Sequence, residues 1–281
     1  MKGFMGLLKY TMMTTALVLA AALPARAVVN DSDLGMHLRG AVGGGAVFMG
    51  YNDYGSTIGD VGTGSGAMFN ASAMLAYKFI GVEGNIFVGS IGDLEWDAEV
   101  LGTKHTYTSN GSGSYMNLDL KLGFDLFREE GDMGYTFIYA GPRYWRMDRK
   151  QDSYEVDGIV SHVDNTQEAK GAGWTVGFRD FSTIGPNDGF AVVLQTALFA
   201  GTAPVDKLKW NNYTSNKKVD QSLTIGGELA LGVALQNIGF SVVGGLRTEA
   251  NVSVFKDPTT DDESAFGLGN AMFFVEAGLM F

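Results

Sequence analysis

Cysteine is absent from the sequence, and histidine occurs only as His37, His105 and His162. Without cysteine no disulfide bond can hold the fold together, and no thiol is present to carry a lipid anchor. Three scattered histidines and no thiolate also deprive a transition metal of its usual ligands. We therefore expect neither a metal nor a cofactor.

Long apolar runs are also missing after the first part of the chain. No run after residue 28 approaches the roughly 18 apolar residues that indicate a transmembrane helix. Before it, Lys2 and Lys9 precede a short apolar stretch and the small-residue pattern Ala25-Arg26-Ala27. That order is typical of a secretory signal peptide. We predict a signal peptide at residues 1–27 and one mature domain at residues 28–281.

Basic residues are outnumbered by acidic ones. The chain has 20 Lys and Arg against 31 Asp and Glu, and the predicted leader contains Lys2, Lys9 and Arg26 but no acid. Residues 28–281 therefore carry 17 basic and 31 acidic side chains, a net charge of −14. Binding to nucleic acid relies on basic contacts with phosphates, so we expect no nucleic acid as a partner.

The mature domain is rich in alternation between apolar and polar residues. From Met116 to Leu126 the apolar side chains take every second position, with Asp119 and Lys121 among the residues between them. A period of two is typical of a β-strand with one apolar and one polar face. Ten segments share the pattern, at residues 34–49, 66–79, 82–99, 114–127, 134–149, 167–183, 189–205, 220–236, 239–256 and 265–281.

The connections between these segments alternate between short and long. The long ones cover about residues 50–65, 100–113, 150–166, 206–219 and 257–264. Short periplasmic turns and long extracellular loops are typical of bacterial outer-membrane barrels. We predict an all-β fold, an antiparallel transmembrane β-barrel of about ten strands in the outer membrane of a Gram-negative bacterium. Eight or twelve strands are alternatives, and a soluble β-sandwich is the competing fold.

Aromatic residues gather at both ends of the segments. Rings at the two membrane interfaces would form two belts on the outer surface. Next to the predicted long loops we expect Trp96, Trp145, Trp174 and Trp210 in one belt. Near the short turns we expect Phe79, Phe127, Tyr135, Phe181, Phe190, Phe240 and Phe281 in the other.

Charged residues recur at the polar positions within the predicted strands. A ten-stranded barrel has a narrow interior, so long side chains of both signs should fill it and pair there. The result is either a narrow ion-selective pore or a salt-bridged plug. The predicted lumenal residues are Arg39, Lys78, Asp119, Lys121, Glu228, Arg247, Glu249 and Glu276.

A second group of acidic residues lies near the end of the third segment. Its members occupy every second position and so share one face of a strand, which we expect to be the lumen at the outer mouth. They could bind a cation or supply an acid–base pair, or form only the solvated face of a projecting strand. They are Asp93, Glu95, Asp97 and Glu99.

The predicted long loops hold two of the histidines and a basic cluster. No partner is evident for His105 or His162, and we expect both to be solvated. Loop 206–219 is basic and could contact lipid phosphates or an acidic neighbouring loop, which fits outer-membrane lipid and lipopolysaccharide as partners. Its lysines are Lys207, Lys209, Lys217 and Lys218.

The C-terminal segment, residues 270–281, resembles the signal strand of bacterial outer-membrane proteins. Phe273, Val275 and Leu279 alternate along it, and Glu276, Gly278 and Phe281 match the polar, glycine and aromatic positions of that signal. The usual further aromatic pair after this core is missing, because the sequence ends at Phe281. The resemblance implies the barrel-assembly machinery as a partner during insertion.

A second resemblance is to the omptins, a family of ten-stranded surface proteases. The segment Asp93-Leu94-Glu95-Trp96-Asp97 is similar to the acidic segment at the top of an omptin strand. In that family two acidic residues face an Asp–x–His pair, and together they activate a water. The comparable strand end here reads Asp206-Lys207-Leu208 and contains no histidine.

Two classes of function follow. The first is a non-enzymatic barrel, either a narrow porin-like channel or a structural or adhesive surface protein. The second is an omptin-like membrane-embedded hydrolase, with Asp93, Glu95 and Asp97 on the acidic side of its site. The missing Asp–x–His favours the first class, and we assign no catalytic residue.

Overall fold

The computed structural model describes residues 36–52, 62–100, 103–126, 134–185, 189–211, 213–214, 218–256 and 263–280. The predicted signal peptide lies outside them. Nearly all described residues are in strands; the others form a short 3₁₀ turn at Gln236–Ile238 and a few turns between strands. Among these residues no helix is long and apolar enough to cross a membrane.

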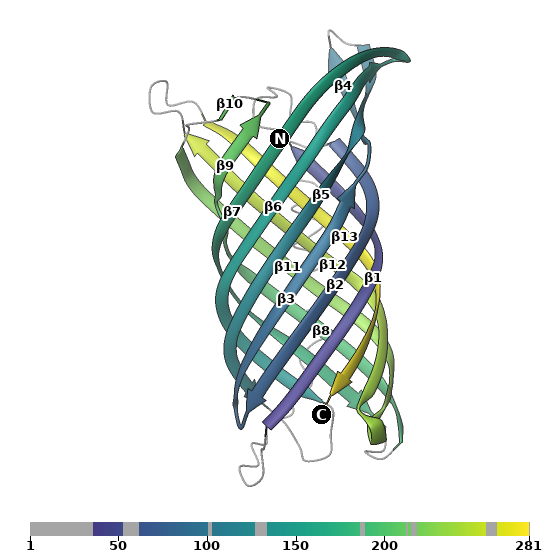
Figure 1. Cartoon of the computed structure of the whole chain (residues 1–281), viewed down its shortest axis with the longest axis vertical. Coiled ribbons are helices and arrows are strands. Elements are labelled where there is room, and N and C mark those ends of the chain that lie inside the picture. The colour runs from purple at the N-terminus through teal and green to yellow at the C-terminus, as the bar shows by residue number, and fades with distance from the viewer. Residues whose placement is uncertain are drawn as a thin grey trace.

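Thirteen strands follow one another along the chain, and together they form one tall, tilted barrel (Figure 1). Their bounds are β1 (Met36–Asn52), β2 (Gly62–Tyr77), β3 (Ile80–Ile91), β4 (Leu94–Val100), β5 (Thr103–Leu126), β6 (Tyr135–Val156), β7 (Ile159–Ile184), β8 (Phe190–Thr202), β9 (Val205–Trp210), β10 (Tyr213–Thr214), β11 (Lys218–Leu235), β12 (Phe240–Lys256) and β13 (Glu263–Met280).

Ten of these strands form a closed antiparallel ring, in the order β1, β2, β3, β5, β6, β7, β8, β11, β12, β13. The first and last strands close it, from Arg39 opposite Met280 to Asn52 opposite Gly267. β4 continues the course of β3 beside β5, and β9 continues that of β8 beside β7. The predicted ten-stranded antiparallel barrel is therefore confirmed.

The two faces of the wall differ as the alternation predicts. On β5, Leu118, Leu120 and Leu122 are 38%, 54% and 60% exposed, whereas Asp119 and Lys121 are buried. Apolar side chains thus cover the outside of the barrel, where lipid replaces water, and the polar positions point inward.

Two of the predicted long loops are in fact β-structure. Residues 103–113 belong to β5, which pairs with β4, and β6 and β7 continue until a two-residue turn at Asp157-Gly158. Both turn residues have positive φ, at 49° and 85°, as a tight hairpin turn requires. These hairpins project beyond the ring (Figure 1), and water on both faces removes the need for alternating apolar residues.

The aromatic belts are only partly where the sequence placed them. Trp174 and Phe190 are 63% and 59% exposed on the outer face. Trp145, Tyr135 and Phe181 are instead almost fully buried inside the barrel, so their assignment to the belts was wrong. A position near the end of a strand does not show whether an aromatic ring points outward or inward. Side chains alternate along the strand, and this alternation places these three rings inside the barrel.

Candidate functional site

The charged residues inside the barrel are the most densely connected polar group that the structure describes. Seven of the eight predicted residues are buried there: Arg39, Asp119, Lys121, Glu228, Arg247, Glu249 and Glu276. Lys78 is not, because it lies exposed in the turn between β2 and β3 with φ at 54°. The turn begins one residue earlier than the sequence indicated, which removes Lys78 from the strand.

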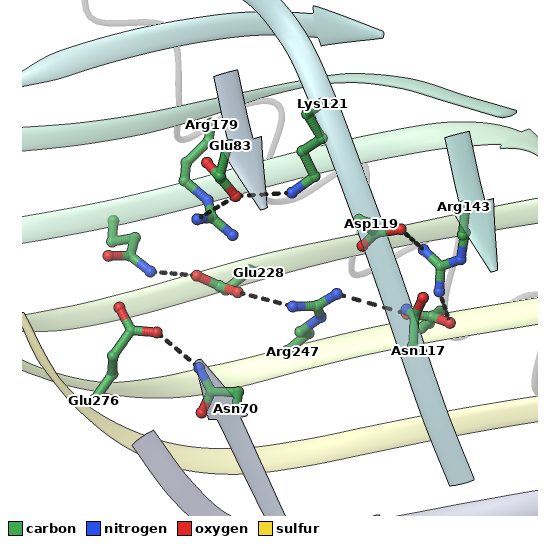
Figure 2. A network of polar contacts seen from close by, with 12 residues as sticks. Asn70, Glu83, Asn117, Asp119, Lys121, Arg143, Arg179, Glu228, Arg247 and Glu276 are labelled. Carbon is green, nitrogen blue, oxygen red and sulfur yellow. Dashed lines mark hydrogen bonds and ion pairs between the residues drawn. The ribbon is translucent and has the colours of Figure 1, made fainter. Parts of the chain in front are cut away.

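One cluster is centred on Glu83 of β3. Its Oε1 accepts hydrogen bonds from Lys121 Nζ and from Arg179 Nη1, both at 3.0 Å (Figure 2). The Lys121 ammonium also lies 4.6 Å from the centre of the Tyr139 ring. One carboxylate is thus held by two cations, and a third face of the site is aromatic.

A second cluster is centred on Glu249 of β12. Arg143 donates a hydrogen bond to its Oε1, and Arg247 lies 3.7 Å from its Oε2. Tyr115 and Asn251 donate to Oε1 at 2.8 and 3.0 Å. The carboxylate therefore has a partner on every side, as a buried charge requires.

The two clusters are linked to each other and to the barrel seam. Arg247 lies 3.9 Å from Glu228, and Gln195 donates a hydrogen bond to Glu228 (Figure 2). Arg39 donates to Gln195 at 3.2 Å and lies 3.5 Å from Glu276. Because Arg39 is on the first strand and Glu276 on the last, the network extends across the closure of the ring.

The charges of this lumenal network balance, and little space remains among them. Its carboxylates are Glu83, Asp119, Glu228, Glu249 and Glu276, and its cations are Arg39, Lys121, Arg143, Arg179 and Arg247. The cavity between these groups is only about 10 Å³, which is about the room that one water molecule needs. The network fills the lumen at its level.

Glu83, Arg143 and Arg179 belong to the network but are not among the eight candidate residues predicted from the sequence. The alternation does hold the signal that would identify them, since Arg143 shares the inward parity of Trp145 on β6. Arg179 likewise lies two residues before the inward-facing Phe181 of β7.

Aromatic side chains pack within the lumen around this network. Trp145 of β6 stacks on Phe266 of β13 with ring centres 5.8 Å apart, and its Nε1 donates to the carbonyl of Ala203 at 2.9 Å. Tyr135 stacks on Phe181 at 5.7 Å, and the Arg39 guanidinium lies 5.0 Å from both rings. These contacts leave the interior packed like the core of a soluble protein.

The acidic group predicted at the mouth does not share the lumenal face. Asp93 and Glu95 are exposed, and Leu94, only 3% exposed, takes the inward position. The lumenal orientation expected for Asp93 and Glu95 is therefore wrong, and their exposure agrees with the alternative of a solvated face on a projecting strand. The side chains of Asp97 and Glu99 lie outside the described residues.

A break in the strand explains the reversal. The register with β5 changes from Ile91 opposite Gly113 to Leu94 opposite Ser109, so β5 holds one residue more than its neighbour between these pairs. Across the break the inward residues Ile91 and Leu94 are three positions apart instead of an even number, so the inward and outward faces are exchanged between β3 and β4. Asp93 lies at the break, and its Oδ1 accepts a hydrogen bond from the Gly111 amide at 2.8 Å.

His105 does have a partner, contrary to expectation. Its Nδ1 lies 2.5 Å from Oδ2 of Asp157, and the Thr106 amide donates to Oδ1 at 3.0 Å. The hydrogen bond from His105, together with that from Thr106, lowers the pKa of Asp157 below its ordinary value. His105 and Asp157 are 52 residues apart, so the sequence pattern alone could not pair them.

The outer wall carries a polar groove of about 480 Å³ across β5, β6, β7 and β9. Glu168 lies at its centre, within 3.6 Å of Lys207, 3.7 Å of Arg146 and 3.9 Å of Lys209. Asp148 accepts two hydrogen bonds from Arg146, at 2.6 and 2.9 Å. Three cations thus meet two carboxylates, and the cluster is net positive on an otherwise acidic protein.

The C-terminal strand has the orientation that its resemblance implies. Phe273, Val275 and Leu279 are 58%, 60% and 45% exposed on the outer face. Glu276 points inward and accepts a hydrogen bond from Asn70 at 2.8 Å. Gly278 is buried, and a Cβ there would contact Ser241 Oγ at 3.1 Å. Phe281, the third position of the predicted signal, lies outside the described residues.

No protein-family model and no curated protein sequence matches the chain. Among solved structures, the outer membrane protease OmpT from Escherichia coli aligns over 90% of this chain and 98% of its own, with a TM-score of 0.54 and 11% identity. The transport unit of the autotransporter AIDA-I from Escherichia coli covers 96% of this chain and 97% of its own, with a TM-score of 0.40 and 9% identity.

The translocator domain of the autotransporter NalP from Neisseria meningitidis covers 97% of this chain and 95% of its own, with a TM-score of 0.37 and 10% identity. All three are outer-membrane barrels, and the likeness to OmpT establishes the fold of this chain as that of an outer-membrane β-barrel. Because the two sequences are only 11% identical, the likeness to OmpT does not assign an activity to this chain.

Proposed function

We propose that this protein is a closed barrel of the Gram-negative outer membrane that acts as a structural or adhesive surface protein and not as a channel. The observation that carries the proposal is the filled lumen. An ion crossing the barrel would have to displace paired charges such as Arg247 and Glu228, because the cavity beside them is only about 10 Å³. The projecting β4–β5 and β6–β7 hairpins are then the parts that meet the surroundings.

The proposal includes lipopolysaccharide as a partner on the outer wall. Arg146 lies two residues beyond Tyr144 on β6, just above the level where Trp174 faces lipid. With Lys207 and Lys209 it forms the net-positive cluster around Glu168, and these side chains are 32–43% exposed. A positive cluster at this height suits the phosphates of an outer-leaflet glycolipid. The orientation of Phe273 and Val275 supports a role for the barrel-assembly machinery during insertion.

An omptin-like hydrolase is the less supported alternative. The fold and the His105–Asp157 pair favour it. Against it, the inward positions at the ends of the comparable strands are occupied by the buried Leu94, Val205 and Leu208. An acidic pair facing an Asp–His pair across the mouth would need polar groups at these positions.

Single-channel conductance of the folded mature protein in a planar bilayer tests the proposal, with a known porin in the same bilayer as the positive control. We expect no conductance from a barrel whose folding is verified by heat-modifiable migration on a gel. Steady openings, above all with a preference for cations, would overturn the closed barrel. Cleavage of peptides by the same preparation would instead favour the hydrolase.

A further inference from the structure

Asp180 of β7 is a carboxylate on the lipid-facing side of the barrel. Its neighbours in the strand, Arg179 and Phe181, both point into the lumen, where Arg179 binds Glu83 and Phe181 stacks on Tyr135. Side chains alternate along a strand, so Asp180 points outward. Thr136, which lies opposite it on β6, has the same outward parity.

Apolar residues lie on both sides of Asp180 along the outer wall. Towards the long hairpins, Ile138 and Val176 are 48% and 59% exposed. Towards the short turns, Ile184 and Phe190 are 70% and 59% exposed. The carboxylate therefore lies within the band of the wall that contacts lipid, and not beyond its edge.

The depth of Asp180 can be derived from the strand. It lies four residues before the end of β7, which is about 13 Å along the strand and roughly 10 Å along the axis at a tilt of about 40°. Each headgroup layer is about 5–8 Å deep. Asp180 thus lies near the boundary between headgroups and acyl chains on the side of the short turns, where a headgroup can reach it.

The carboxylate is oriented by hydroxyl groups. Thr136 Oγ1 donates to Oδ1 at 2.5 Å, and Ser182 Oγ donates to Oδ2 at 2.7 Å. Asp180 is 8% exposed, so a ligand can reach only a small part of it. Within the part of the chain that the structure describes, Asp180 forms no ion pair. A charged group at membrane depth without a counter-charge is costly, and such groups generally mark a binding site.

We propose that Asp180, with Thr136 and Ser182, binds the primary ammonium group of a phospholipid in the periplasmic leaflet, as in phosphatidylethanolamine. A primary ammonium supplies the missing positive charge and three N–H donors, which the carboxylate oxygens can still accept. A divalent metal ion fits less well, because it needs more oxygen ligands than one carboxylate supplies. The proposal goes beyond the closed barrel and does not depend on it, since a conducting barrel would present the same wall.

Native mass spectrometry of the folded mature protein tests this inference. The protein is released from micelles that hold equal amounts of phosphatidylethanolamine and phosphatidylcholine with matched acyl chains. The second lipid keeps the positive charge but has no N–H donor. We expect about tenfold greater retention of phosphatidylethanolamine, in line with a hydrogen bond to a charged group.

Asp180→Asn should abolish that preference while the barrel still folds, because the amide keeps the shape of the side chain. Asp152→Asn is the matched control, since it removes an exposed carboxylate that lies 3.2 Å from Lys150 near the β6–β7 turn. It should leave the preference intact. Should Asp180→Asn fail to fold, Ser182→Ala removes one orienting hydroxyl and should reduce the preference in part.

Equal retention of the two lipids by the unaltered protein would overturn the proposal. So would an unchanged preference in Asp180→Asn. If a cation of this chain or of a partner protein pairs with Asp180, the unaltered protein should retain the two lipids equally, and Asp180→Asn should lose stability. Conductance measured in parallel separates these results from the fate of the closed barrel.

Discussion

Arg143 and Glu249 lie on strands that are four places apart around the ring, and the guanidinium donates a hydrogen bond to the carboxylate across the lumen. Both side chains are 1% exposed. Their strands do not pair with each other, so the contact forms only when the sheet has curled enough to bring them together across the lumen. The pair therefore ties two separate parts of the wall together.

Loss of this carboxylate should weaken the barrel strongly. Glu249→Gln removes the carboxylate that Arg143 and Arg247 share and leaves Arg143 with Asp119, at 3.7 Å, as its counter-charge. Breaking a buried ion pair on one side costs about 3–5 kcal/mol. We expect the free energy of unfolding, measured by urea denaturation in lipid vesicles, to fall by about that amount. A change below about 0.5 kcal/mol would contradict the assigned pairing.

Removal of both charges should cost less than removal of one. In the double variant Arg143→Met/Glu249→Met one cation and one carboxylate are lost together, so the buried charges stay balanced, and apolar side chains can fill part of the space. Unfolding in the same vesicles should place the double variant above Glu249→Gln in stability. If the double variant is the weaker of the two, the surrounding Tyr115 and Asn251 depend on Glu249 more than the ion pair does.

A channel should appear when the network is removed. Replacing Arg143, Arg247, Glu228 and Glu249 together with serine deletes equal numbers of positive and negative charges and opens space at the level of the network. We expect measurable single-channel conductance from this variant and none from the parent barrel. If neither the variant nor the parent barrel conducts ions, the Trp145–Phe266 stack alone closes the lumen.

Substitution with alanine should impair folding at one glycine of β1 and not at another. A Cβ at Gly45 would lie 1.9 Å from the carbonyl oxygen of Phe273 on β13, whereas a Cβ at Gly40 meets nothing within 4 Å. Gly45→Ala should therefore impair closure of the ring, and Gly40→Ala should fold normally. The fraction of heat-modifiable protein after refolding measures both, and equal yields would contradict the close approach of β1 to β13 at Gly45.

The contact between His105 and Asp157 should weaken in acid. The pKa of Asp157 is lowered by its hydrogen bonds, so the stabilisation is complete above the ordinary aspartate value near 4 and is lost as the pH falls below it. The protection factor of the Thr106 amide, which is its exchange rate relative to that of an unstructured peptide at the same pH, should fall over that range. Asp157→Asn should show no such fall, and a pH-independent protection factor in the parent would rule out the linkage.

The sequence predicts the membrane-spanning part of this protein well because lipid imposes a rule there. Leu118, Leu120 and Leu122 must face hydrocarbon, so the alternation of apolar residues shows which positions of the strand face outward. Above the membrane no such rule acts, and residues 103–113 were predicted as a loop although they form the upper part of β5.

The candidate site was predictable where strand parity decides it and not elsewhere. Asp119 and Glu249 were assigned to the lumen from alternation alone, whereas Leu94 displaced Glu95 from the inward face through a bulge that leaves no clear mark in the sequence. The approach of Asp157 to His105 depends on how two hairpins lie side by side, which is a property of the folded barrel.

The balance of charges inside the barrel has an electrostatic consequence outside it. The lumenal network holds as many cations as carboxylates, so it adds nothing to the net charge of −14 carried by residues 28–281. The whole excess therefore lies on residues outside the network. The soluble faces of the protein should repel polyanions and attract cationic peptides, with a strength that salt reduces over a screening length of about 8 Å at physiological ionic strength.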